Sequence, residues 1–573
     1  MNISCKEDKG QTEKSNDLYK YQPIGQNEIR ILMLHSGSNS NLKCDLKHFT
    51  LDQAPKYEAV SYCWGDSTLR VNITCENQIL SITQGLHSAL LHFRSQMGDN
   101  DQPRVLWADG ICIDQSNLDE RSDQVRLMGQ IYTNAKPVLV WLGEGDPETR
   151  DLLRKALVVG RLSDLKPGKA TDEMAEQILK LLSAPWFSRT WIIQEVALAD
   201  EVLIWYGDTR IGWDMVQEVA RNLITLIMPS DRGLFLLTNF FNINTICRCR
   251  RNNSQIDPFR LLQECRSSIA TDPRDKIYAM IGLFNPPGGV DFTIQPDYRA
   301  DVSKVYLDFA IKSLQATQNL DLLSVPRAPP REGLPLWAPR WDPEVPITIS
   351  DVILKRIAAT RQIAWAGTQH YQPIFSEDHT RLKISGHIIG TIEAVSETVQ
   401  SMPQIGNQDA LVRKGPTIIN LGEINDWLQT TRGDIEGVYF TGEPMFDAHW
   451  KTHIAGAVSQ EEEAEFREDF MQLYSTNISD LLLGRRDLSH KLGGERRSAV
   501  QGRRFMRTSE GMIGLAPGVA AVGDCVGVFE GGMVPLVLRL RGENWELLGD
   551  CYVHGVMLGE AFEEGSCHEF WLI

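Results

Sequence analysis

The segment from Arg104 to Asp146 constrains the fold more strongly than any other part of the sequence. An apolar run at residues 105–108 is followed by a polar turn, an amphipathic helical pattern and a second apolar run at residues 137–142. This order predicts a strand, a helix and a second strand. Because a crossover helix of this length returns the chain to the same end of a sheet, the two strands are expected to be parallel and buried on both faces.

Polar residues follow the first of these strands. Asp109, Asp114 and Gln115 come soon after the apolar run, and in open parallel sheets ligands bind at the carboxyl ends of the strands. Asn117, with Glu120 three residues later, resembles a capping box and predicts the start of the helix. The sequence therefore predicts a ligand-binding edge where the strand ends and the helix begins.

Further apolar runs extend the same pattern along the first third of the chain. Strands are expected near residues 57, 104, 137 and 201, with helices between them. A strand near residue 31 and a hairpin at residues 71–82 are expected as additions at an edge. The alternation predicts an α/β fold with a flavodoxin-like open parallel sheet.

The remainder of the chain changes character. Residues 214–325 are mainly helical in pattern and residues 326–345 form a connector rich in proline and tryptophan, whereas residues 346–573 are mixed. Within this last part, short alternating runs with frequent glycine predict a small β-rich module at residues 505–565. His554 in this module is interpreted as a core histidine with satisfied hydrogen bonds, and the TDPRDK turn at residues 271–276 as an ion-paired tie to the first domain.

Composition narrows the class of protein. The 573 residues include 42% hydrophobic and 23% charged residues, which is typical of a globular protein with two or three domains. The formal charge of −17 disfavours nucleic acid or an anionic membrane as a partner. The longest apolar stretch, at residues 233–243, is too short to span a bilayer. We therefore expect no nucleic-acid partner and no membrane span.

The amino terminus and the cysteines predict a cytoplasmic protein. Residues 1–25 are polar and lack the apolar core of a secretory signal, so a disordered leader is expected. The 11 cysteines are scattered and odd in number, which favours reduced thiols. Cys247 and Cys249 lack a second pair or a nearby histidine, and we predict no metal site. The sequence also lacks a Gly-rich phosphate loop.

Several blocks together carry a family resemblance. The stretches YEAVSYCWGD, LWADGICIDQSNLDERSDQVRLMGQIYTNAKPVLVWLG and RTWIIQEVALA, in this order and spacing, resemble the blocks of the fungal heterokaryon incompatibility (HET) domain. The core blocks lie at residues 57–200, within an expected domain at residues 26–213. IATDPRDKIYAMIGLF, LPLWAPRWDP and the glycine-rich terminal stretches resemble segments that accompany this domain. The resemblance implies self/non-self recognition in filamentous fungi with a cell-death response, through self-association or an incompatibility partner protein.

A second resemblance concerns chemistry. The order of elements, with Trp191 followed by Glu195 in a W-x-x-x-E arrangement, is similar to that of TIR domains. Some TIR domains cleave the nicotinamide glycosidic bond of NAD with such a glutamate, so the resemblance implies Glu195 as the catalytic residue and NAD as a substrate rather than a cofactor. A carboxylate beside the ribose can stabilise an oxocarbenium-like transition state.

The candidate ligand-binding residues each have a functional and a structural interpretation. Asp109 could bind a ligand hydroxyl or cap the turn that follows it. Arg189 could bind a phosphate or form an ion pair with Glu195. Glu195 itself is expected either at the edge of a cleft or exposed on its helix. Asp114 and Gln115 have the alternative of satisfying free backbone amides. The complete set of candidate ligand-binding residues is Tyr62, Trp64, Gly65, Asp109, Asp114, Gln115, Arg189 and Trp191.

The aromatic candidates and two cysteines also have both a functional and a structural interpretation. Tyr62 and Trp64, beside Gly65, are suited to form a wall on which a flat base stacks, although core packing explains Tyr62 equally well. Cys63 and Cys112 have no histidine close in sequence, so buried thiols are favoured over a nucleophile.

Two functions from different classes follow. The first is hydrolysis of NAD or a related nucleotide by Glu195. The second is a non-catalytic signalling module that triggers cell death by assembly through exposed helix faces. Convergence of Glu195, Trp64 and Asp109 on one pocket would favour the enzyme, whereas scattered positions would favour the assembly module.

Overall fold

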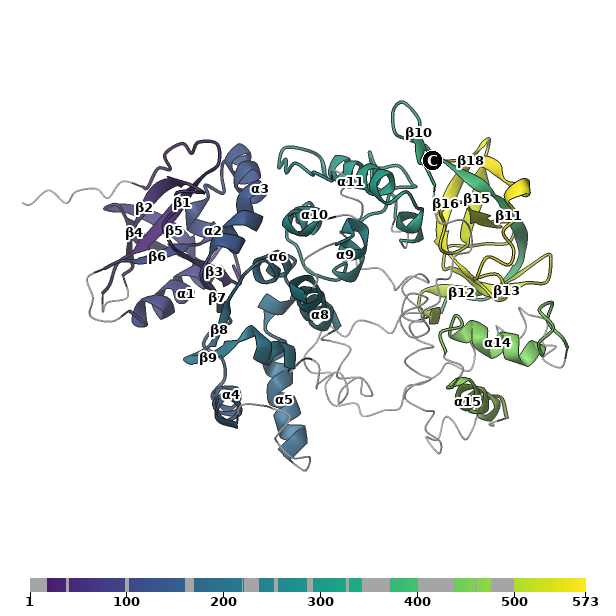
Figure 1. Cartoon of the computed structure of the whole chain (residues 1–573), viewed down its shortest axis with the longest axis horizontal. Coiled ribbons are helices and arrows are strands. Elements are labelled where there is room, and N and C mark those ends of the chain that lie inside the picture. Colours follow the sequence, from purple (N-terminus) through teal and green to yellow (C-terminus); the bar gives the residue numbers. More distant parts are fainter. Residues whose placement is uncertain are drawn as a thin grey trace, which may run out of the picture.

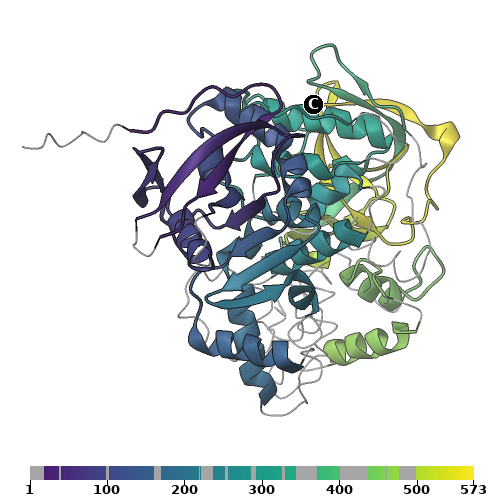
Figure 2. The same ribbon diagram turned by 60° about the vertical axis from the view of Figure 1, so that its left-hand side comes forward.

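The computed structural model describes most of the chain. Of the disordered leader expected at residues 1–25, residues 1–17 lie outside the described residues, but residues 18–25 are ordered against the first sheet: Leu18 bridges to Ile79 and the hydroxyl of Tyr21 donates to the carbonyl of Ile111. The described residues are 18–37, 41–97, 102–159, 170–218, 220, 237–251, 256–285, 292–325, 329–342, 371–399, 437–458, 461–475 and 499–573. Figure 1 shows an amino-terminal sheet, a helical layer and a carboxyl-terminal sheet side by side. Figure 2, turned by 60°, shows the same helices between the two sheets.

The amino-terminal sheet has nine strands in the order β5-β4-β2-β1-β6-β3-β7-β8-β9. Its strands are β1 (Glu28–Leu34), β2 (Lys43–Thr50), β3 (Glu58–Tyr62), β4 (Arg70–Cys75), β5 (Gln78–Thr83), β6 (Arg104–Trp107), β7 (Val138–Trp141), β8 (Val202–Tyr206) and β9 (Thr209–Gly212). The helices in this part of the chain are α1 (Gln84–Ser95), α2 (Asp109–Cys112), α3 (Leu118–Asn134), α4 (Pro147–Val159), α5 (Ala170–Leu182), η2 (Pro185–Ser188) and α6 (Ile192–Ala197).

The α/β class is confirmed, and the open sheet is mixed, with antiparallel strands added on both sides of the predicted parallel core. The strands β6, β3, β7 and β8, which are those expected near residues 104, 57, 137 and 201, are parallel as predicted. The outer pairs β1–β2, β1–β6, β4–β5 and β8–β9 are antiparallel. The β4–β5 and β8–β9 links are two residues long, at Glu76–Asn77 and Gly207–Asp208. Links this short join only antiparallel strands, so the sheet is mixed.

A buried ion pair joins strand β1 of this sheet to helix α3. Arg30 on β1 is fully buried, and its guanidinium donates to both carboxylate oxygens of Glu120 at 2.5 and 3.0 Å. Glu120 also accepts from the backbone N–H of Asp114 at 2.7 Å, and Arg30 donates to the carbonyl of Cys112 at 3.1 Å. One pair thus fixes β1, the loop after β6 and the start of α3 together.

The predicted capping box is correct for Asn117 but wrong for Glu120. The side chain of Asn117 does cap α3, accepting from the backbone N–H groups of Asp119 and Glu120. The carboxylate of Glu120 binds Arg30 and the Asp114 N–H, instead of reaching back to Asn117. The physical reason is that a buried guanidinium needs an anion to offset its desolvation, and Glu120 is the one that it contacts.

The helical layer follows the first sheet in sequence and lies beside it. Its described elements are α8 (Leu237–Arg251), α9 (Pro258–Glu264), α10 (Asp275–Tyr278), η4 (Ile281–Leu283), α11 (Val302–Thr317) and η6 (Asp321–Ser324). Trp337 and Trp341 of the predicted connector are both buried in the core that runs from the first sheet to the second. None of the described helices is long and apolar enough to cross a bilayer.

The carboxyl-terminal sheet begins earlier than the predicted β module. Its strands are β10 (Ile374–Phe375), β11 (Leu382–Val395), β12 (Arg503–Thr508), β13 (Ile513–Pro517), β14 (Cys525–Phe529), β15 (Leu536–Arg541), β16 (Asn544–Asp550), β17 (Tyr552–Val553) and β18 (His568–Leu572). Helices α14 (Met445–His453) and α15 (Glu463–Ser475) and the short turn η8 (Glu564–Ser566) accompany it. His554 contacts Glu443 and Tyr552 through its two ring nitrogens, as expected of a core histidine.

We predict that Glu120→Ala lowers the free energy of unfolding of the amino-terminal unit by about 3–5 kcal/mol, because it leaves Arg30 buried without an anion. Urea denaturation measures this loss. Asp123→Ala, an exposed acid on the same helix, is the control, with an effect within about 0.5 kcal/mol. The double variant Arg30→Met with Glu120→Leu is expected to recover most of the loss, and a double variant no more stable than Glu120→Ala would contradict the assignment.

Candidate functional site

The candidate residues meet at the carboxyl ends of β3 and β6. Trp64 follows β3, and its indole N–H donates to a carboxylate oxygen of Asp109, which follows β6, at 2.9 Å. Arg189, at the end of η2, donates from its guanidinium to the carbonyl of Tyr62 at 2.5 Å. Residues from three distant parts of the sequence are therefore brought together at the predicted edge of the sheet.

Glu195 lies behind these residues, on helix α6. It is 3% exposed, so the interpretation of Glu195 as an exposed helix residue is wrong. Its carboxylate accepts a hydrogen bond from the hydroxyl of Ser61 on β3, and the Ser61 hydroxyl accepts from the indole N–H of Trp186 at 2.7 Å. Burial raises the pKa of Glu195, although the positive charge of Arg189 and the hydrogen bond from Ser61 both act to lower it.

Asp109 and Arg189 are the other two ionisable side chains of this cluster. Burial raises the pKa of Asp109, and the opposing influences are Arg189, the Trp64 indole and the N–H of Gly110. Burial acts to lower the pKa of Arg189, but the carboxylates of Glu195 and Asp109 hold it above its ordinary value. The cluster thus has two carboxyl groups for one guanidinium, an arrangement that favours holding a proton on one carboxyl group.

The remaining candidates have mainly structural contacts. The carboxylate of Asp114 accepts from the backbone N–H and the hydroxyl of Ser116, and the side-chain amide of Gln115 donates to the carbonyl of Asp109 at 2.9 Å. Both interactions hold the loop between α2 and α3. Gly65 is exposed, with a φ of 67° that favours glycine. Tyr62 is 2% exposed and its ring packs in the core.

Close packing accounts for Gly110 in this site. A Cβ atom at this position would lie 2.5 Å from the Tyr62 hydroxyl oxygen. Only a residue without a side chain therefore lets the turn after β6 approach β3 so closely.

Cys63 and Cys112 do not form a nucleophilic site. Cys112 is fully buried, and burial raises the pKa of its thiol to about 12, so it stays protonated at neutral pH. Cys63 is half-buried. Among the described residues, no group of three or more histidine, cysteine or acidic side chains is placed to hold a metal ion.

Trp191 is directed away from the cluster, toward the helical layer. Its indole N–H donates to Asp275 at 3.1 Å, and the hydroxyl of Tyr298 donates to the same carboxylate at 2.5 Å. The guanidinium of Arg121 on α3 lies 3.6 Å from the centroid of the Tyr298 ring and 3.7 Å from an oxygen of Asp275. We call Arg121, Trp191, Asp275 and Tyr298 the latch.

The TDPRDK turn at residues 271–276 is predicted from the sequence to be held by local ion pairs and to tie the helical region to the first domain. Arg274 and Asp272 do form a local ion pair at 2.8 Å, as expected. The tie to the first domain is made by Asp275, which is 6% exposed and joins the helical layer to both α3 and α6. Burial raises the pKa of Asp275 to about 6 despite the hydrogen bond from Tyr298 and the charge of Arg121.

Sequence reasoning missed Ser61, Trp186 and the latch partners Arg121 and Tyr298. The one available signal was Ser61, a polar residue on a strand whose neighbours Ala59, Val60 and Tyr62 are all buried. A polar side chain in such a run requires a buried hydrogen-bond partner, but its position in sequence does not identify Glu195.

Comparisons with known proteins agree with the blocks quoted above. A family model described as heterokaryon incompatibility protein (HET) matches residues 57–195, and one described as the Het-6 beta-barrel domain matches residues 485–573. The chain is 24% identical over 697 aligned positions to heterokaryon incompatibility protein 6, OR allele, of Neurospora crassa, covering 98% of this chain and 99% of that protein. No solved structure matches the chain. The HET resemblance is confirmed, and nothing in these comparisons supports the TIR resemblance.

We predict that the latch makes stability depend on pH. Since the pKa of Asp275 rises from 3.8 to about 6 on folding, the folded state binds more protons than the unfolded state in this window. The free energy of unfolding therefore falls as pH rises from 4 to 7. Relative to Asp275→Asn, the wild type is expected to lose about 2 kcal/mol over this range, since one pKa unit is worth about 1.4 kcal/mol and the unfolded state is already partly ionised at pH 4.

Urea denaturation of both proteins at several pH values in this range measures the difference. Asp308→Asn, an exposed aspartate on α11, is the control, and its curve is expected to run parallel to that of the wild type. Parallel curves for Asp275→Asn and the wild type would show that Asp275 does not titrate in this window.

Proposed function

This chain is a HET-domain protein, and we propose that it acts in fungal self/non-self recognition, with cell death as the response to fusion of incompatible partners. The similarity to a heterokaryon incompatibility protein over nearly the full length of both chains supports this role. We further propose a cytoplasmic location, which is consistent with the absence of any disulfide among the described cysteines.

We propose that the effector activity resides in the first sheet and is the cleavage of NAD or a related nucleotide. The observation that carries this proposal is the convergence of Glu195, Arg189 and Asp109 at the carboxyl ends of parallel strands. In chain order, the four parallel strands lie as second, first, third and fourth. This order supports our proposal of a flavodoxin-like sheet, in which ligands bind beside the carboxyl end of the first strand, here β3, which Trp64 follows.

Each member of the cluster has a role in this chemistry. Trp64 provides a flat surface for a base, Asp109 an acceptor for a ribose hydroxyl, and Arg189 a cation for phosphate. The bond between the nicotinamide nitrogen and ribose C1 breaks, nicotinamide leaves with the electron pair, and water adds to C1 with loss of a proton. Glu195 stabilises the positive charge that develops on the ribose. Because Glu195 is 3% exposed, the half-buried Asp109 and Arg189 form the outer part of the site.

One observation favours a second candidate function, a non-catalytic module that signals by assembly. The carboxylate of Glu195 is already held by Ser61 and lies near Arg189, and Trp191 contacts the latch rather than a ligand. These are the contacts of side chains that hold a fold together. In this alternative the buried cluster rigidifies the domain and exposed helix faces, on this chain or an incompatibility partner protein, carry the signal.

We predict that the purified full-length protein depletes NAD and that Glu195→Ala slows the depletion by about a hundredfold or more, because one electrostatic stabiliser of the transition state is lost. Chromatography of NAD and nicotinamide over time measures the rate. Glu201→Ala, which removes an exposed carboxylate just before β8, is the control and is expected to retain the wild-type rate.

The outcome separates the two candidates. Light scattering on the same samples reports assembly, and circular dichroism reports whether Glu195→Ala remains folded. Assembly of the wild type with constant NAD would reject the enzyme and support the signalling module. Equal rates for Glu195→Ala and the wild type would assign the cleavage to another group.

A further inference from the structure

The long strand β11 is bordered by different strands along its length. At Gly386 it pairs with Phe529 of β14 and with His568 of β18, so these two strands lie on opposite sides of β11. At Ile392 the backbone exchanges hydrogen bonds with Gly523 and Asp524, next to β14, whereas Thr508 of β12 is its other partner. Hence β18 and β12 follow each other along the side of β11 opposite β14.

A gap separates β18 from β12 on that side. Among the described strands, β18 pairs with β11 only as far as Gly386 and β12 pairs with it only from Ile392 onward. The carbonyl of Thr391 accepts from the N–H of Ser509. Among the strands that the structure describes, β11 from His387 to Gly390 therefore pairs on one side only, with β14. Unpaired strand edges are sites for the addition of another strand.

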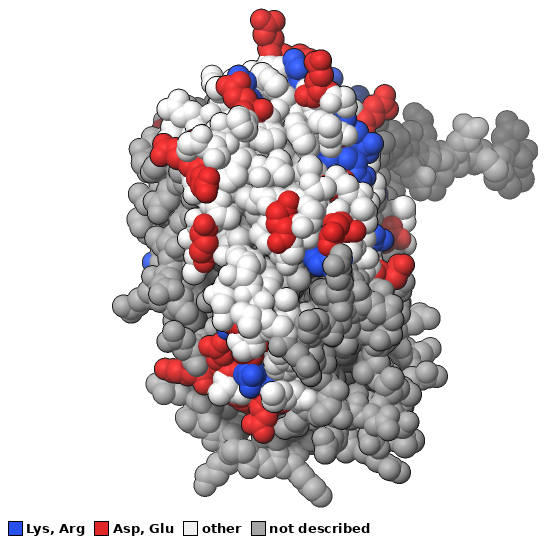
Figure 3. Space-filling view, turned by 90° about the vertical axis from the view of Figure 1, so that its right-hand side faces the viewer, with Lys and Arg blue, Asp and Glu red and all other residues white. Residues whose placement is uncertain are grey.

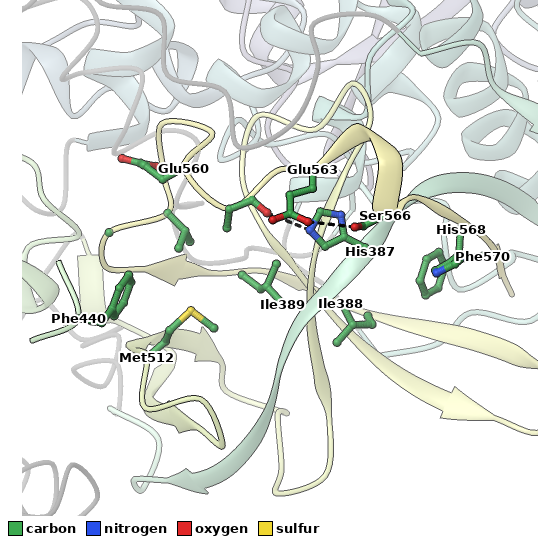
Figure 4. A pocket seen from close by; sticks show the side chains of 13 residues that line it. His387, Ile388, Ile389, Phe440, Met512, Glu560, Glu563, Ser566, His568 and Phe570 are labelled. Carbon is green, nitrogen blue, oxygen red and sulfur yellow. Dashed lines mark hydrogen bonds between the residues drawn. The ribbon is translucent and has the colours of Figure 1, made fainter.

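A cavity of about 650 Å³ opens at this gap. Figure 4 shows Ile388 and Ile389 of β11 between Phe440 and Met512 on one side and His568 and Phe570 on the other. The lining combines apolar and polar side chains, and its acidic members are Glu560 and Glu563, with no lysine or arginine among the lining residues. An occupant with apolar side chains and a positive charge matches this chemistry.

The side chain of His387 is held in place beside the gap. His387 Nε2 contacts the carbonyl of Ala561 at 2.9 Å, and since a carbonyl only accepts, this nitrogen carries the proton. The other ring nitrogen, Nδ1, is buried and has no hydrogen-bond partner among the described residues. Figure 4 shows the ring beside Glu563 and Ser566, which hydrogen-bond to each other at 3.0 Å.

The rim of the cavity is apolar and exposed. Phe440 lines the cavity and is 57% exposed, and Leu558, between the lining residues Val556 and Glu560, is 51% exposed. On the carboxyl-terminal side of the molecule, Figure 3 shows a broad uncharged surface with scattered acidic side chains and basic ones mainly near one edge. Large exposed apolar side chains beside a cavity are typical of protein-binding surfaces.

We propose that this opening binds a short extended segment of a partner protein, which adds to β11 as a strand and carries alternating apolar and basic side chains. Its backbone pairs with the free edge at residues 387–390, its apolar side chains enter the cavity and its lysine or arginine side chains reach Glu560 and Glu563. This surface is separate from the cluster around Glu195, and the inference does not depend on catalysis there.

The test uses the full-length protein and fluorescein-labelled peptides of alternating valine and lysine, six residues long, with blocked ends. Fluorescence anisotropy measures the dissociation constants. The lysine peptide is expected to bind about tenfold or more tightly than the same peptide with glutamate in place of lysine. Methylation of alternate backbone nitrogens, which removes N–H donors but keeps every side chain, is expected to weaken binding by about tenfold or more.

Variants locate the binding. Glu560→Lys with Glu563→Lys, both exposed positions, is expected to weaken binding of the lysine peptide about tenfold or more. Glu543→Lys, an exposed acid in the β15–β16 turn, is the matched control and is expected to change it less than about twofold. Circular dichroism checks that both proteins are folded.

Several results would overturn the proposal. The lysine peptide would fail to bind, or it would bind no more tightly than the glutamate peptide. Alternatively, Glu543→Lys would weaken binding as much as the double variant Glu560→Lys with Glu563→Lys. Unchanged affinity of the methylated peptide, or its full displacement by a free apolar amine such as benzylamine, would make the cavity a small-molecule site and reject strand addition.

Discussion

The stability of the amino-terminal unit depends on one constraint. Its central parallel strands are buried, so any charged side chain among them needs an oppositely charged partner within the protein. Arg30 and Glu120 satisfy this requirement at one edge of the parallel core, and Arg189 with Glu195 and Asp109 satisfies it at the carboxyl ends. Burying an unpaired charge costs several kcal/mol, so each of these residues is stable only with the others present. The same requirement that holds the fold together thus concentrates polar chemistry at one end of the sheet.

The latch connects this end of the sheet to the rest of the protein. Helix α6 carries Glu195 on one side and follows Trp191, whose indole contacts Asp275 of the helical layer. A displacement of α10 or of the Tyr298 loop would therefore act on the helix that positions Glu195. This arrangement links the helical layer to the proposed effector site, since the indole of Trp191 bonds directly to Asp275 and the carboxylate of Glu195 to Ser61.

The two proposals divide the work of the protein between its two sheets. The first sheet offers a cluster of charged side chains for the proposed nucleotide, whereas the second offers a strand edge and a cavity, lined by apolar and acidic side chains, for the proposed peptide. A protein that responds to a partner needs both a surface for that partner and an output. The helical layer, packed in the same core as both sheets, is the part of the structure that lies between them.

The sequence by itself determined the central strands and helices of the first sheet and the resemblance to HET-domain proteins. Apolar runs predicted the four parallel strands, Asn117 predicted the start of α3, and the quoted blocks identified the HET domain, because periodicity and capping are local properties of the chain. Tertiary structure alone decided the partners. Arg30 and Glu120 are 90 residues apart and Ser61 and Glu195 are 134 apart, and the opening beside β11 depends on where β18 and β12 end. Local pattern reports that a side chain is buried but not which distant group it meets there, and that meeting fixes the charge, the hydrogen bonds and the chemistry of a site.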